Sequence, residues 1–364
     1  AGDFVSIQYK QTLEKMWSYS AYSLRPDGGI PLNNDSDIKD ISNRLLTKAE
    51  EYNRPDWRYI ATNGEAGKQP QGLATKVFPW AGQVIMRSGW KRDAHWAFFD
   101  IGPWGLSHQH NDKLHLSVSA YGRNLLVDSG RFAYQGEVAE KFRKPYAVHS
   151  RGHNVILVDG EGQKPGPLVT DKPLSEDSYE VNECFDFARS SFDQFEIEGK
   201  VEHFRAVFYL KSKFWIVIDH IETDRSRKIN PLWHFHPDCT VEIQGSEVVT
   251  IDKEEGNLRL IPVGDIKWDI NIIQGQTEPT IQGWYSEKYN KYVPGSCMAY
   301  SAEIKKDSTF GWMLKPGGGR VSSLQVKIIS TDSNSVVLEI KENNEKYIFR
   351  VPFKKGKKPE LYNK

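Results

Sequence analysis

The chain of 364 residues is long for one compact core, and this length predicts at least two structural units. Lysine plus arginine and aspartate plus glutamate both number 48, so no net charge attracts nucleic acid or an anionic membrane surface. The three cysteines are odd in number and far apart, which predicts no disulfide framework. No apolar run approaches the roughly 18 to 20 residues of a membrane span.

The first part of the chain carries apolar residues at helical spacing. Residues 4–24 read FVSIQYKQTLEKMWSYSAYSL, and residues 36–53 read SDIKDISNRLLTKAEEYN, with Ser36 and Asp37 as candidates for a helix cap. This pattern predicts a mostly helical segment at 1–80.

Beyond this segment the sequence changes to short runs rich in Val, Ile, Tyr, Phe and Trp, separated by Gly, Pro, Asn and Asp. Examples are QVIMRSGW at 83–90, FWIVIDHIE at 214–222 and SVVLEIKE at 335–342. Short runs at this spacing are typical of antiparallel sheets packed as a sandwich. We therefore expect a mainly β protein, with the main β-sandwich at 81–296 and a smaller carboxy-terminal sheet at 297–364.

One run, at 114–121, alternates apolar and polar residues. Leu116 and Val118 lie on one side of the expected strand, and the serines that follow them lie on the other. This alternation predicts one buried face and one polar face. Gly122 and Arg123 predict a tight turn into the next strand.

Side chains that commonly bind metals surround this strand. His108, His110 and Asp112 lie just before it, Asp128 ends the next apolar run, and His153 opens a later run. Two imidazoles and a carboxylate are typical zinc ligands, whereas calcium would need a shell dominated by carbonyl and water oxygens. The alternative is a polar, hydrogen-bonded loop without a metal.

The expected register bears on this choice. If the hairpin turns at Gly122 and Arg123, Asp128 lies opposite about Ser117 and not opposite His110. A metal site therefore requires the loop that carries His110 to curl back.

Several sequence landmarks resemble a known family. GLSHQHNDKLHLSVSAYGRNLLVDSGRFAY at 105–134, followed by HNVILVDG at 153–160, is similar to the signature of the heparinase II/III-like polysaccharide lyases. RPDGGIPLNNDSD at 25–37, FPWAGQVIMRSGW at 78–90 and WHFHPD at 233–238 also resemble that family. The resemblance implies an α/α toroid of paired helices followed by a stacked antiparallel β-sandwich. Only the last toroid helices would then lie within 1–80.

The resemblance also implies an activity and residue roles. Members of the family cleave uronate-containing polysaccharides by β-elimination. His110, Asp128 and His153 match the family's metal ligands, usually described as zinc, and we expect that metal to be structural. His108 matches the histidine that reaches into the cleft, where an imidazole can take or give a proton near neutral pH.

Weaker candidates lie nearby. Tyr134 could assist proton transfer, and Trp104, Arg143 and Tyr146 could contact the sugar or its anionic groups, although each is also explained as an ordinary packed or surface residue.

The family's toroid supplies a residue that binds the substrate carboxylate and a tyrosine that moves protons. The chain by itself is therefore expected to show little turnover. Polymer degradation implies a periplasmic or secreted bacterial protein, whose export signal either has been removed or was never part of this chain. The alternative function is a non-catalytic, metal-stabilised β-sandwich that binds carbohydrate.

Overall fold

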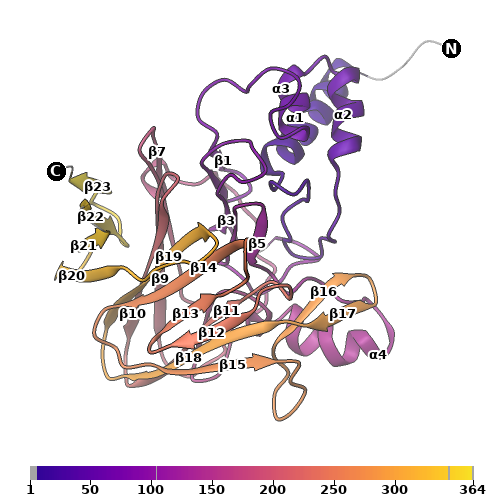
Figure 1. The fold of residues 1–364 in the computed structure, drawn as a ribbon. Coiled ribbons are helices and arrows are strands. Elements are labelled where there is room, and N and C mark those ends of the chain that lie inside the picture. The colour runs from indigo at the N-terminus through magenta and orange to yellow at the C-terminus, as the bar shows by residue number, and fades with distance from the viewer. Residues whose placement is uncertain (1–5, 104, 343–344, 363–364) are drawn as a thin grey trace.

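The computed structural model describes residues 6–103, 105–342 and 345–362. Its amino-terminal part contains three helices (Figure 1). Their buried apolar side chains, among them the indole of Trp57, form one core cluster. None of the helices in the described ranges is long and apolar enough to cross a membrane. The helices are α1 (Ile7–Ser23), α2 (Ser42–Glu51) and α3 (Pro55–Ala61).

A five-stranded antiparallel sheet follows, with its strands in chain order. The turn between its last two strands falls at Tyr121 and Gly122, which both have positive φ, and not at the predicted Gly122 and Arg123. Two consecutive residues of positive φ are typical of the tightest hairpins. The strands are β1 (Lys76–Phe78), β2 (Gln83–Arg87), β3 (Trp96–Asp100), β4 (Leu116–Ala120) and β5 (Arg123–Leu126).

The expected polar face of β4 is not exposed to solvent. Ser117 and Ser119 are both buried, since the segment that joins α1 to α2 covers this side of the sheet. On that segment, Asp27 accepts a hydrogen bond from the Asn124 side chain at 2.8 Å. Alternation therefore identified the strand correctly, but the polar side faces another part of the protein and not water.

The largest sheet has eight antiparallel strands in the order β12-β13-β14-β19-β10-β9-β8-β7. Its apolar side chains contribute to two separate core clusters, so both faces of the sheet are covered. This explains the uninterrupted apolar run at 214–218. The strands are β7 (Tyr179–Val181), β8 (Phe185–Phe192), β9 (Val201–Leu210), β10 (Phe214–Thr223), β12 (Val241–Gln244), β13 (Glu247–Thr250), β14 (Gly256–Val263) and β19 (Ser308–Gly318).

On one side, the eight-stranded sheet shares a core with the five-stranded sheet and with a four-stranded sheet ordered β15-β18-β11-β6. The strands of that smaller sheet are β6 (Ile156–Val158), β11 (Arg227–His234), β15 (Asp269–Gln274) and β18 (Ser296–Ile304). Beside it lie the hairpin β16 (Trp284–Lys288) with β17 (Lys291–Pro294), and α4 (Gly136–Val138), which continues as a π-helix over Ala139–Ala147 (Figure 1).

On the other side, the eight-stranded sheet packs against the carboxy-terminal sheet, drawn in yellow in Figure 1. That sheet begins at Gln325, so the predicted boundary at 297 is wrong. The residues just after 297 extend β18, and β19 lies in the centre of the eight-stranded sheet, because both long apolar strands need partners inside the main sandwich. The four strands are β20 (Gln325–Thr331), β21 (Ser335–Glu342), β22 (Glu345–Pro352) and β23 (Glu360–Tyr362).

Candidate metal and catalytic site

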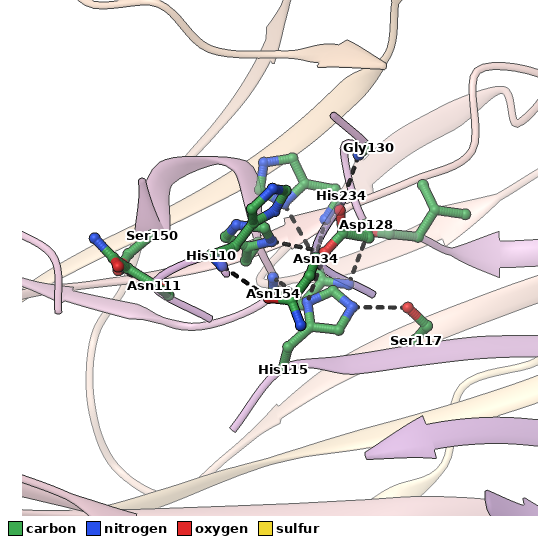
Figure 2. Close-up of polar contacts among 12 residues, drawn as sticks. Asn34, His110, Asn111, His115, Ser117, Asp128, Gly130, Ser150, Asn154 and His234 are labelled. Carbon is green, nitrogen blue, oxygen red and sulfur yellow. Dashed lines mark hydrogen bonds and ion pairs between the residues drawn. The ribbon is translucent and has the colours of Figure 1, made fainter. Parts of the chain in front are cut away.

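The structure brings together the three predicted metal ligands. His110, Asp128 and His153 are buried, and one potential ligand atom from each lies within 4.8 Å of the other two. Asp128 follows β5, where its Oδ1 accepts a 2.8 Å hydrogen bond from the backbone N–H of Gly130 (Figure 2). Its Oδ2 lies 2.7 Å from Nδ1 of His153. We name these three residues the buried triad.

Two ring nitrogens of the buried triad have no hydrogen-bond partner. They are Nδ1 of His110 and Nε2 of His153, and both are inaccessible to solvent. A buried polar atom without a partner costs about 1–3 kcal/mol, so such atoms are rare unless a ligand satisfies them. The two imidazoles and the Asp128 carboxylate make a donor set of nitrogen and oxygen ligands, which fits zinc.

The charges of the buried triad are complementary. Burial alone would raise the pKa of Asp128, yet the neighbouring His153 imidazole holds that pKa well below its usual range. Burial alone would lower the pKa of His153, yet the Asp128 carboxylate raises it to about 8. The nearby His115 lacks such a close partner, and burial lowers its pKa to about 3. The site therefore stabilises a positive charge beside Asp128.

The loop before β4 does curl back, as a metal site requires. The backbone N–H of His110 donates to Oδ1 of Asn34 at 2.8 Å, and that of Asn111 donates to the carbonyl of Val148 at 2.8 Å. The loop then turns at Leu114, whose φ is +75° and whose N–H donates to the carbonyl of Asp100. These bonds bring His110 close to Asp128, just after the end of β5. The hairpin register alone would not place these two residues opposite each other.

Asn154 fixes the third member of the buried triad. Its Nδ2 donates to the carbonyls of Leu116 and Val127, at 2.9 and 3.1 Å, and its Oδ1 accepts from the backbone N–H of His234 at 2.6 Å (Figure 2). One buried amide thus ties together the chain at β4, β5 and β11. Because His153 immediately precedes Asn154, its position depends on all three strands.

His108 lies at the surface beside the buried triad. Its side chain is 63% exposed, and its backbone φ of +56° is uncommon for a residue other than glycine. Nδ1 of its ring lies 2.7 Å from Oδ2 of Asp35 and 3.3 Å from the hydroxyl of Tyr134. The predicted catalytic imidazole is therefore accessible to a substrate, while Asp35 and Tyr134 contact its Nδ1.

Tyr134 is partly exposed, and two arginines contact its ring. The guanidinium carbons of Arg131 and Arg143 lie 4.7 and 5.0 Å from its ring centroid. Arg131 also makes a bidentate pair with Asp37, and Arg143 makes one with Asp35. The two cations hold the tyrosine beside His108 through cation–π contacts.

Sequence reasoning missed Asp35. It lies 73 residues before His108, in the segment that joins α1 to α2, and it contacts His108, His110 and Arg143. Burial would raise its pKa, but hydrogen bonds from His110 and Arg143 hold the pKa well below its usual range. The available signal was the run NNDSD within a segment that resembles the family.

Comparison with known proteins places the chain in a family. A match to the family described as "Heparinase II/III-like, C-terminal" spans residues 70–312, about two thirds of the chain. The chain belongs to this family.

Two curated relatives of this heparinase II/III-like chain are heparin-sulfate lyases. The protein from Pedobacter heparinus is 24% identical over 313 residues, which cover 83% of this chain and 44% of the relative. The protein from Bacteroides stercoris is 24% identical over 307 residues, which cover 83% of this chain and 43% of the relative. The chain thus spans less than half of the length of these relatives.

Solved structures share the fold of this heparinase II/III-like chain. Heparan sulfate lyase HepC from Pedobacter heparinus superposes with a TM-score of 0.81 at 21% identity, covering 97% of this chain and 55% of that one. A structure of heparinase III superposes with a TM-score of 0.76 at 18% identity, covering 96% of this chain and 55% of that one. The mainly β, stacked-sandwich architecture expected from the sequence is confirmed.

The remaining predicted contacts have different outcomes. Trp104 lies outside the described residues. Arg143 reaches the site, where it pairs with Asp35. Tyr146 cannot bind substrate, because its ring is completely buried and its hydroxyl donates to the carbonyl of Trp284 at 3.0 Å. The Tyr146 ring packs in a core cluster with Phe132 and Phe142, which explains why it is buried and not exposed.

Tyr146→Phe should therefore affect stability and not substrate binding. Removal of the hydroxyl loses this hydrogen bond and a second one, which the hydroxyl accepts from the backbone N–H of Trp284 at 3.3 Å. The free energy of unfolding should therefore fall by about 1–3 kcal/mol, measured by urea denaturation. KM for any polymer that the full-length protein cleaves should stay unchanged. A rise in KM without a loss of stability would contradict the buried placement.

Proposed function

We propose that this chain is part of a polysaccharide lyase that cleaves a uronate-containing glycosaminoglycan by β-elimination. One observation carries the proposal: an exposed imidazole, His108, lies two residues from the buried triad and is anchored through one ring nitrogen. Membership of the heparinase II/III-like family and two relatives named heparin-sulfate lyases support the same class of substrate.

The chemistry suits this arrangement. The base removes the proton on C5 of the uronate, the bond between C4 and the bridging oxygen breaks, a double bond forms between C4 and C5, and the leaving oxygen gains a proton. The ring nitrogen of His108 that does not face Asp35 is the group positioned to take the C5 proton. The Tyr134 hydroxyl, 3.3 Å from the other ring nitrogen, is a second proton carrier.

We also propose that the buried triad holds zinc and that the protein acts in the periplasm or outside the cell. His110, Asp128 and His153 would supply the ligands. Bound zinc would cross-link the loop before β4 to the residues after β5, which fixes the position of His108. The unpaired ring nitrogens of His110 and His153 support this assignment.

Incubation of the full-length protein that carries this chain with heparan sulfate tests the function. We expect release of chain ends with an unsaturated uronate, detected by the ultraviolet absorbance of the new C4–C5 double bond. Tight binding of the polymer without such ends, by zinc-loaded protein, would instead favour a non-catalytic carbohydrate-binding module.

Elemental analysis tests the metal. We expect about one zinc per chain, as a three-ligand site requires. His110→Ala and Asp128→Asn should both lose the zinc and lower the thermal midpoint, because zinc binding stabilises only the folded chain. His236→Ala, which changes a histidine outside the buried triad, should retain it. If the wild-type protein contained no zinc after exposure to zinc, the result would favour the alternative of a polar, hydrogen-bonded loop without a metal.

A further inference from the structure

The carboxylate of Asp35 connects two histidines that have different proposed roles. Its Oδ2 lies 2.7 Å from Nδ1 of His108, and its Oδ1 lies 3.1 Å from Nε2 of His110. Arg143 donates to both oxygens. The carboxylate therefore faces four N–H positions, which matches the number of lone pairs on its two oxygens. Its side chain is only 5% exposed, so protein groups supply these donors in the folded chain.

An ionised carboxylate only accepts hydrogen bonds, so each imidazole that contacts it must donate. His108 then carries its proton on Nδ1, and His110 carries its proton on Nε2. The opposite nitrogens become free: Nε2 of His108 at the surface, and Nδ1 of His110 in the interior, where it has no other partner. One carboxylate thus selects opposite tautomers in two histidines only two residues apart.

We propose that Asp35 is a positioning residue that sets both tautomers and thereby links the metal site to the catalytic histidine. The inference rests on the proposed lyase function for the role of His108, and on the proposed zinc site for the role of His110. Asp35 directs Nδ1 of His110 toward the metal and Nε2 of His108 toward the substrate.

The competing contact of His108 is weaker. The Tyr134 hydroxyl lies 3.3 Å from the same Nδ1, compared with 2.7 Å for the Asp35 oxygen. A hydrogen bond to a charged acceptor is about twice as strong as one between neutral groups, and it is usually shorter. Asp35 therefore determines the orientation of the His108 ring.

The backbone around Asp35 is anchored independently. Asn34 has a φ of +52°, a conformation that asparagine tolerates, and its side chain accepts from the N–H of His110. Two residues after Asp35, Asp37 makes a bidentate pair with Arg131 at 2.6 and 2.8 Å. Asp37 contacts neither histidine in the described structure, which makes it a matched control.

The first test compares Asp35→Asn with Asp37→Asn in the full-length protein. The amide introduced by Asp35→Asn would present a donor to at least one imidazole and remove its preferred tautomer. For this variant we expect a fall of about 100-fold in kcat with little change in KM, and zinc affinity about 10- to 100-fold weaker in competition with a chelator. Asp37→Asn should change zinc affinity far less. Equal losses of zinc affinity in the two variants would overturn the proposal.

The second test needs no substitution at Asp35. Histidine-selective ¹⁵N labelling of the zinc-loaded wild-type protein reports which nitrogen of each ring carries the proton, and the His108 signals are identified by their absence in His108→Gln. We expect protonated Nδ1 in His108 and metal-bound Nδ1 in His110. A proton on Nε2 of His108 would overturn the proposal.

The two tests separate this inference from the function on which it rests. If the wild-type protein cleaved no uronate polymer, the lyase proposal would fail, while the zinc affinities and tautomers would still decide whether Asp35 sets the two rings. If cleavage were normal but His108 had the opposite tautomer, only the role of Asp35 would fail.

Discussion

His108→Ala is expected to lower kcat/KM for uronate polymer by about 100- to 10,000-fold in the full-length protein, the usual contribution of a positioned acid–base group. The imidazole is exposed, so its removal leaves no buried cavity, and it is not a member of the buried triad. Zinc content and thermal midpoint should therefore match those of the wild-type protein. Release of unsaturated uronate, measured at saturating and limiting polymer, gives the rate.

A second substitution separates proton transfer from loop anchoring. His108→Asn places an amide N–H near the position of Nδ1, so it can still donate to Asp35, but it has no basic nitrogen. We expect it to be as inactive as His108→Ala. Near-normal turnover of His108→Asn would show that the side chain only anchors the loop.

Arg205→Met is expected to be the most destabilising substitution. Arg205 is buried in β9, and its guanidinium donates to both oxygens of Asp219 at 2.7 and 3.1 Å. It also donates to the carbonyls of Leu114 and Asn154 at 2.9 and 2.6 Å, which lie next to the site. Without Arg205, the buried Asp219 carboxylate keeps only its contacts with His203 and Trp312, at 2.7 and 2.9 Å. Breaking a buried ion pair by removing one partner typically costs about 3–5 kcal/mol. Urea denaturation of the zinc-loaded protein measures this loss.

The control removes both charges. In the double variant Arg205→Met with Asp219→Leu, no carboxylate remains buried without its partner. Its free energy of unfolding should therefore fall by less than the sum of the two single losses. Strictly additive losses would show that the two side chains stabilise the protein independently, contrary to their direct contact.

The β-sandwich was predicted from short apolar runs and their periodicity, which are local features of a sequence. The sequence also placed metal-binding side chains around the strand at 114–121, but the choice of His110, Asp128 and His153 among them came from the resemblance to the family. The expected hairpin register argued against the site. The loop at 110–115 nevertheless curls back, through contacts with Asn34 and Val148 that are distant in sequence and could not be predicted from it.

The partner of His108 could not be predicted in this way. Asp35 belongs to a polar turn in the helical part of the chain, where an aspartate is ordinarily explained by capping or solvent exposure. Asp35 contacts His108 and His110 only because the tertiary fold packs that turn against the loop before β4. The boundary at 297 was wrong for a related reason, since strand order within a sheet is decided by non-local pairing.

The eight-stranded sheet gives neighbouring residues of one strand different packing partners. In β10, Trp215 and Val217 pack into the core shared with the strands around the buried triad, whereas Ile216 and Ile218 pack into the core shared with the carboxy-terminal sheet. Substitutions at adjacent positions should therefore be compensated in opposite halves of the molecule. Trp215 and Val217 should covary with residues of the half that carries the site. Ile216 and Ile218 should covary with residues of the carboxy-terminal sheet.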